Sequence, residues 1–183
     1  LVKVDRDSTG LWFFNSGPRA GASQPHRHLQ LLPRHHNESI CPRMPWFTEH
    51  LSTRTPSPLS DQMIDPLTTS CVIAERPASS DPEEEAIRLH ELYRSLAERL
   101  GLGAVASLDP PAVPYNLLLT HSWMALIRRS QDEIHGFSVN ALGFAGYLLA
   151  TDRSDLSWLQ THGGEQLLRQ VVADLSGFTD AGN

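Results

Sequence analysis

Apolar and polar positions mark two strands near the start of the chain. Residues 11–16 form a short apolar run, and residues 25–33 alternate, so we expect them to pair as neighbouring strands. Two more apolar runs, at 115–120 and 122–128, are separated by a tight reversal at Thr120–Ser122 that favours a hairpin. These patterns predict a largely antiparallel sheet.

The clearest helical pattern covers residues 82–100. Asp81 is a suitable N-cap, Pro82 fits the first turn, and the acidic residues 83–85 favour the positive end of the helix dipole. Gly101 ends the pattern. Its apolar stripe comprises Ile87, Leu89, Leu92, Tyr93, Leu96 and Leu100.

Three other segments give weaker signals. Residues 33–82 are rich in proline, which excludes long elements, but apolar pieces at 45–51 and 65–75 predict short helices or strands packed on the core. Residues 141–150 are small and apolar and predict a buried helix, and residues 155–175 predict a helix broken at two adjacent glycines. The mixture predicts an α+β fold with a mostly antiparallel sheet, flanking helices and a long proline-rich excursion.

Composition is typical of a globular protein with one domain. The 183 residues are 40% hydrophobic and 20% charged, and no run of about eighteen apolar residues predicts a membrane span. The start is too charged for a signal peptide, and Cys41 and Cys71 lack the spacing of metal ligands. We therefore expect a cytoplasmic protein with reduced thiols and no membrane partner.

Charge is distributed unevenly along the chain. The net charge of −6 argues against general nucleic-acid binding, so we expect no nucleic-acid partner. Residues 1–43, however, hold six Lys or Arg against three acidic residues, whereas the rest of the chain holds nine against eighteen. A small anionic ligand near the start fits this asymmetry, and so does a solvated basic face.

The stretch from Gly21 to Pro33 concentrates the candidate chemistry. Read as a strand, it presents a polar side that can line a cleft and an apolar side that can be buried. The polar side comprises His26, His28 and Gln30, and the other side comprises Arg27, Leu29 and Leu31. A glycine-rich loop precedes the stretch, and backbone N–H groups of such a loop can approach a ligand closely.

Three interpretations of the two histidines compete. They are surface polar residues on an edge strand, or they hold zinc or manganese, for which His35 and His36 are poorly placed as further ligands. The third interpretation is a histidine nucleophile that attacks phosphorus. Such a nucleophile needs a hydrogen bond that sets its tautomer, and donors for the phosphate oxygens. The candidate donors are Ser23, Gln24, the Gly21 backbone and Gln30.

The segment FNSGPRAGASQPHRHLQLLP, residues 14–33, closely resembles the signature of the diadenosine tetraphosphate phosphorylases, also called ATP adenylyltransferases. This family belongs to the histidine triad superfamily, in the branch of galactose-1-phosphate uridylyltransferase, which has His-x-His-x-Gln where the hydrolases have a third histidine. Residues 115–131 and 138–150 resemble its carboxy-terminal segments. Arg128 is a departure, because the family usually has proline before the arginine-serine pair.

The resemblance implies a role for each motif residue. His28 would be the nucleophile that carries the nucleotidyl group, and His26 would support the site without being modified. Gln30 would hold a non-bridging phosphate oxygen. The phosphate- and nucleotide-binding residues would be Asn15, Gly21, Ser23 and Gln24.

The resemblance also implies a reaction and its partners. Diadenosine tetraphosphate would be phosphorolysed to ATP and ADP through an adenylyl-histidine, with inorganic phosphate as the acceptor. We expect no tightly bound cofactor and no metal site of the protein. Magnesium would accompany the nucleotide substrate.

The expected organisation is one histidine-triad-like catalytic domain over residues 1–183. Motif strands lie in 1–36, the proline-rich excursion in 37–81, and a helix with C-terminal strands and helices in 82–183. Family members normally carry a long segment before the motif, so we expect an N-terminally shortened chain in which Leu1–Val4 end a helix. An open sheet edge there favours a homodimer. The alternative functions are a catalytically impaired nucleotide-binding remnant, a dimerisation module and a metal-dependent hydrolase.

Overall fold

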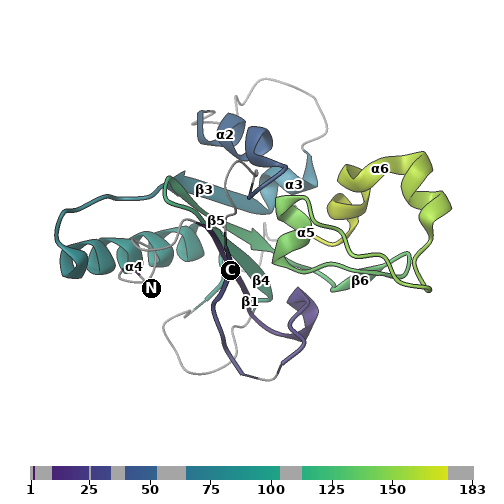
Figure 1. The fold of residues 1–183 in the computed structure, drawn as a ribbon, viewed down its shortest axis with the longest axis horizontal. Helices are drawn as coiled ribbons and strands as arrows, with labels where there is room; N and C mark the ends of the chain where they lie inside the picture. The colour runs from purple at the N-terminus through teal and green to yellow at the C-terminus, as the bar shows by residue number, and fades with distance from the viewer. Residues whose placement is uncertain are drawn as a thin grey trace, which may run out of the picture.

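A five-stranded antiparallel sheet forms the centre of the fold (Figure 1). The computed structural model describes residues 2, 10–24, 26–33, 40–52, 65–103 and 113–172. The strand order is β2-β1-β4-β5-β3. The strands are β1 (Gly10–Asn15), β2 (Gln30–Pro33), β3 (Cys71–Glu75), β4 (Tyr115–Leu119) and β5 (Trp123–Arg128). The predicted α+β fold with a mostly antiparallel sheet and flanking helices is confirmed.

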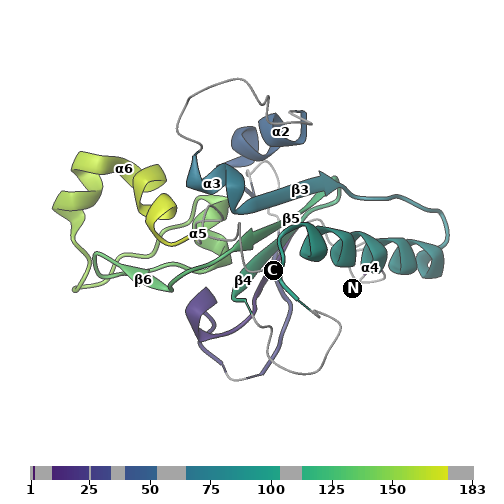
Figure 2. The same cartoon turned by 180° about the vertical axis from the view of Figure 1, so that it is seen from behind.

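Helices lie on both sides of this sheet, with α2 and α3 on one side and α4 on the other (Figures 1 and 2). The helices are α2 (Met44–Ser52), α3 (Pro66–Thr69), α4 (Pro82–Arg99), α5 (Ala141–Ala145) and α6 (Leu156–Gln170), with the short 3-10 helix η1 (Pro18–Ala20). A small two-stranded sheet pairs β6 (Glu133–Ile134) with β7 (Phe137–Ser138). No described helix is long and apolar enough to cross a membrane.

The two faces of the sheet carry separate cores because side chains alternate along each strand. One core joins Trp123 of β5 to residues of α2, α3, α5 and α6, and we call that side the α5 face. The other core joins Met124 of β5 to Leu89 and Leu96 of α4, and we call that side the α4 face. The same alternation puts Phe13 on the α5 face, and Trp12 and Phe14 on the α4 face.

The predicted helix at 82–100 is present as α4. It begins as expected, because the Asp81 carboxylate accepts a hydrogen bond from the Glu83 N–H at 2.9 Å. Beyond its end, Gly101 has φ 61°, a conformation that favours glycine. The predicted stripe is wrong at Ile87, which is 61% exposed.

The remaining predictions are confirmed in part. The strands predicted at 115–120 and 122–128 are β4 and β5, and the proline-rich excursion contains α2, α3 and β3. The helix predicted at 155–175 is α6, whose helical geometry is interrupted at Gly163. The helix predicted at 141–150 is wrong in length, because α5 ends at Ala145 where the next residue adopts a left-handed φ of 112°.

Both cysteines have free thiols. Burial raises the pKa of Cys41 to about 11 and the pKa of Cys71 to about 12. The two thiols are therefore protonated near neutral pH, and neither offers a thiolate nucleophile.

The packing of α4 can be tested with a pair of truncations. Leu96 is fully buried on the α4 face, so Leu96→Ala should lower the free energy of unfolding by about 2–5 kcal/mol. Ile87 lies on the same helix but is exposed, so Ile87→Ala should cost less than about 0.5 kcal/mol. Urea unfolding of the two variants measures the difference, and equal losses would contradict the orientation of α4.

Candidate functional site

The two histidines precede β2 instead of lying within it. The strand predicted over 25–33 begins only at Gln30, and its pairing with β1 ends at Phe13↔Gln30. Along its other edge, β1 pairs with β4 from Trp12 to Asn15. The predicted strand is therefore wrong for residues 26–29.

His28 is half-buried, and its ring has a defined orientation. Its Nδ1 lies 3.2 Å from the carbonyl oxygen of His26. A carbonyl oxygen can only accept, so Nδ1 carries the proton and donates. The lone pair of the neutral imidazole is then on Nε2, the atom that remains for attack on an electrophile.

The His26 side chain contributes differently from its backbone. Its ring is exposed, and its centre lies 5.1 Å from the centre of the His28 ring at a tilt of 46°. The His26 carbonyl is what fixes the tautomer of His28. The ring of His26 flanks the candidate nucleophile.

The loop between β1 and the histidines is closed by its own backbone. The carbonyl of Gly17 accepts from the N–H groups of Ala20 and Ala22 at 2.9 and 3.1 Å, and the Gly21 N–H donates to Pro18 O at 2.8 Å. The amide of Gly21 is thus used inside the loop. The predicted polyphosphate contacts, Ser23 and Gln24, follow the loop and are both exposed.

Gly21 holds the loop against the segment that precedes α5. It has φ 79°, and a Cβ at this position would lie 2.7 Å from Val139 O and 2.9 Å from Asn140 Cα. Arg19 adds a second link, donating from Nη2 to Ser130 O at 2.6 Å. The position needs glycine both for its left-handed backbone and for this close approach.

Asn15 ends β1 and is half-buried. Its Oδ1 accepts from Asn116 Nδ2 at 2.7 Å and from the Ala141 N–H at 2.9 Å. Asn15 is two positions after Phe13, so the alternation of β1 puts it on the α5 face. Gln30 lies opposite Phe13 in the register and therefore shares that face.

The predicted residues come from the end of β1, the glycine-rich loop and the segment that leads into β2. Within this set the structure shows the contact of His26 with His28. Sequence reasoning missed Asn116 and the start of α5, which contact Asn15 directly. The signal for Asn116 was a single amide inside the apolar run 115–120.

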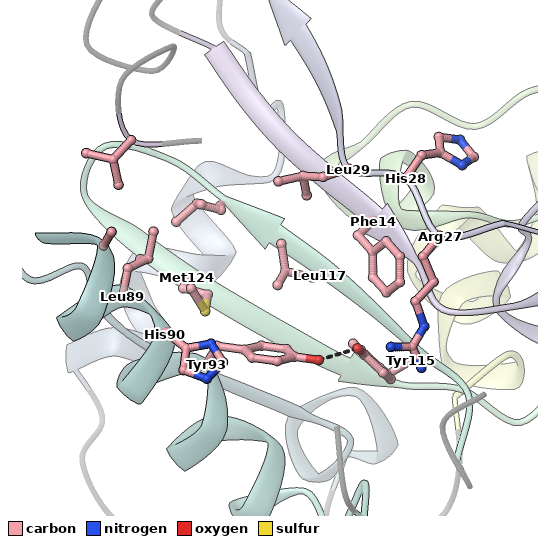
Figure 3. Close-up of a pocket in the computed structure, with 13 residues that line it drawn as sticks. Phe14, Arg27, His28, Leu29, Leu89, His90, Tyr93, Tyr115, Leu117 and Met124 are labelled. Atoms are coloured by element: carbon pink, nitrogen blue, oxygen red, sulfur yellow. Dashed lines mark hydrogen bonds between the residues drawn. The ribbon is translucent and has the colours of Figure 1, made fainter. Parts of the chain in front are cut away.

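A pocket of ≈ 490 Å³ lies on the α4 face. Three consecutive residues of the histidine stretch, Arg27, His28 and Leu29, line it together with Phe14 and Tyr115, so the alternation predicted for this stretch does not hold here. Figure 3 shows the Arg27 side chain extending toward Tyr115, while the His28 ring lies at the edge and is directed away from the other side chains. His28 thus borders this pocket, although its ring does not point into it.

The polar end of the pocket is formed by two tyrosines. The hydroxyl groups of Tyr93 and Tyr115 are 2.5 Å apart (Figure 3). Burial raises the pKa of both phenols, so they are neutral near neutral pH. The walls are otherwise mainly apolar, which is typical of a pocket within a core.

The predicted alternative of a metal site needs a cluster of ligands. In the described ranges, no group of three or more His, Cys, Asp or Glu residues could hold a metal ion. His26 and His28 form only a pair there. His35 and His36 lie outside the described residues.

Two family models cover most of the chain. Residues 1–48 match the Ap4A phosphorylase N-terminal domain, and residues 64–174 match the ATP adenylyltransferase C-terminal domain. The chain belongs to the ATP adenylyltransferase family. The predicted family resemblance is confirmed.

Two curated proteins of Saccharomyces cerevisiae are similar. Diadenosine 5',5'''-P1,P4-tetraphosphate phosphorylase 2 is 30% identical over 157 residues, which cover 80% of this chain and 46% of that protein. Protein APA1 is 29% identical over 161 residues, which cover 81% of this chain and 47% of that protein. This ATP adenylyltransferase family chain thus spans about half the length of the curated relatives it matches.

Solved structures agree with the fold. The crystal structure of yeast Ap4A phosphorylase Apa2 in complex with AMP matches with a TM-score of 0.64 and 25% identity, covering 98% of this chain and 61% of that chain. Apa2 in complex with Ap4A matches with a TM-score of 0.60 at 24% identity, covering 90% of this chain and 55% of that chain. The predicted histidine-triad-like fold is confirmed.

The loop geometry can be tested with two glycine substitutions. Gly21→Ala should destabilise the protein by about 1–3 kcal/mol, because the residue has a left-handed φ and abuts Val139. Gly17→Ala, in the same loop, should change stability by less than about 0.5 kcal/mol, because nothing lies within 4 Å of the added Cβ. Thermal and urea unfolding compare the variants, and a tolerated Gly21→Ala would contradict the described docking of the loop.

Proposed function

We propose that the chain is a nucleotidyltransferase that phosphorolyses diadenosine tetraphosphate to ATP and ADP. The observation that carries the proposal is the hydrogen bond from His28 Nδ1 to the His26 carbonyl, which leaves Nε2 as the nucleophilic atom. The family membership and the basic character of residues 1–43 support the same conclusion. The roles of His28, His26, Gln30, Asn15, Gly21, Ser23 and Gln24 remain predictions.

In the first step, the Nε2 lone pair of His28 attacks an α-phosphorus of the dinucleotide in line. The bond from that phosphorus to the bridging oxygen breaks, and its electron pair leaves with ATP. The new adenylyl-imidazole is cationic and keeps its Nδ1 proton, which the His26 carbonyl accepts as a hydrogen bond. A phosphate leaving group needs no proton, so this step uses no general acid.

In the second step, an oxygen of inorganic phosphate attacks the same phosphorus. The nitrogen–phosphorus bond breaks, ADP forms, and His28 returns to its neutral state. Gln30 shares the α5 face with Asn15, where an amide can donate to a non-bridging oxygen as charge develops. Magnesium bound to the nucleotide would neutralise charge on the polyphosphate.

Replacing the nucleophile separates its role from that of its neighbour. His28→Ala should lower kcat for phosphorolysis at least about a thousandfold, because no covalent intermediate can form. His26→Ala keeps the backbone carbonyl that orients His28, so its loss should be much smaller. Coupled assays of ATP release, with labelled ATP to trap acid-labile adenylyl-protein, measure both effects.

The same assays distinguish the alternative functions. Turnover or trapped label that persists in His28→Ala would contradict the nucleophile assignment. ATP binding by calorimetry without turnover in the unsubstituted chain would instead support a nucleotide-binding remnant. Activity that releases AMP and disappears with chelator in the absence of phosphate would support a metal-dependent hydrolase. The cytoplasmic location and the homodimer also stay predictions, and analytical ultracentrifugation tests the latter.

A further inference from the structure

A buried arginine stands behind the candidate site. Arg129 is 1% exposed, and Phe144 lies against its guanidinium, 5.1 Å from the ring centre. Its donors reach Asn116 Oδ1 at 2.6 Å and the carbonyl oxygens of Val139 at 2.8 Å, Gln131 at 2.6 Å and Val171 at 3.0 Å. A cation in this environment is costly unless its donors are satisfied, and here backbone carbonyls and one amide satisfy them.

The protonation of Arg129 determines how the side-chain amide of Asn116 is oriented. Burial lowers the pKa of Arg129 to about 9, which still leaves it charged near neutral pH. A guanidinium has donors only, so Asn116 must turn its Oδ1 toward Arg129. The Asn116 Nδ2 then faces the other way, toward Asn15 Oδ1 at 2.7 Å and Ala20 O at 2.8 Å.

The same reasoning fixes Asn15. Its partners, Asn116 Nδ2 and the Ala141 N–H, are both donors, so its Oδ1 must face them. The Asn15 side chain therefore turns its NH2 group away from this network. Asn15 is half-buried at the end of β1, two positions after Phe13, whose partner Gln30 begins β2 two positions after His28.

We propose that Asn116 and Arg129 are positioning residues that orient the Asn15 amide, so that its NH2 donates to a phosphate oxygen of the nucleotide at His28. The inference rests on the proposed function for the identity of that ligand. It adds two residues, one in β4 and one directly after β5, that approach the site only through Asn15 and the loop.

The network can do more than hold one side chain. Because Asn116 Nδ2 also donates to Ala20 O, the same amide holds the glycine-rich loop beside Asn15. Hydrogen bonds in a chain polarise one another, so the charge of Arg129 strengthens the outward donor at Asn15. The site thus gains positive potential while the cation itself stays buried.

Asn116→Asp is the sharpest variant, because it preserves shape and keeps an acceptor for Arg129. The carboxylate can no longer donate to Asn15 Oδ1 or Ala20 O, and it favours an Asn15 amide turned with NH2 inward. We expect kcat for phosphorolysis to fall by about a hundredfold, with a smaller change in KM, because the lost donor acts mainly on charge that develops in the transition state.

Arg128→Gln is the matched control. Arg128 is also buried, but it lies on the other side of β5, where Nη1 donates to Leu100 O at 3.3 Å. Loss of that arginine should lower stability and leave kcat within about threefold of the unsubstituted chain. A kcat for Asn116→Asp as high as that of the control would overturn the proposal.

A measurement on the unsubstituted chain does not depend on turnover or on the folding of Asn116→Asp. With 15N-labelled asparagine, addition of ATP should shift the side-chain NH2 signal of Asn15, which Asn15→Asp identifies by its absence. An Asn15 signal that does not move while ATP binds would overturn the proposal. If the Asn15 signal shifts but the chain does not phosphorolyse the dinucleotide, the orientation of Asn15 is supported and the proposed reaction is refuted.

Discussion

The pairing of β1 with β4 is the constraint on which the site depends. Its register places Asn15 opposite Asn116, and this pair lies where the sheet meets the glycine-rich loop and the start of α5. A slip of one residue would move every side chain of β1 to the opposite face. Phe13 would leave its core, and the Asn15 amide would face the side of α4.

Polar and apolar interactions agree on this register. On the α5 face, Leu11, Phe13 and Leu118 are buried next to the amides of Asn15 and Asn116. Buried amides are tolerated only when their donors and acceptors are satisfied, and Arg129, Ala20 and Ala141 supply the partners. The hydrophobic core therefore sets the position of the strands, and the amides allow only one arrangement of their ends.

The sequence predicted the helices and strands whose signals lie within their own residues. The helix at 82–100 has a cap, a stripe and a glycine stop within its own residues, and β4 and β5 are continuous apolar runs. The limits of the histidine stretch could not be predicted the same way. The apolar–polar alternation of the sequence continues through His26 and His28, but pairing with β1 ends at Gln30.

The motif indicated the residue types of the candidate site, but not what orients them. Asn15 was expected as a ligand contact. The hydrogen bond of its side-chain Oδ1 with Asn116 could not be predicted in this way, because it joins residues that are 101 positions apart. Arg129 was noted only within its arginine-serine pair, since a basic residue after a strand is usually exposed. Its burial follows from the approach of the segments around Val139 and Val171, which a linear pattern does not encode.

The long sequence separation of β1 and β4 also affects the order of folding. Closing a loop of about a hundred residues is slow compared with forming a local hairpin, because entropy is lost before contacts compensate for it. During synthesis β1 and β2 leave the ribosome well before β4 exists, with Leu11, Trp12 and Phe13 still lacking their neighbours on that side. The nascent chain thus passes through a stage with an apolar strand edge open to solvent, which is a surface that chaperones bind.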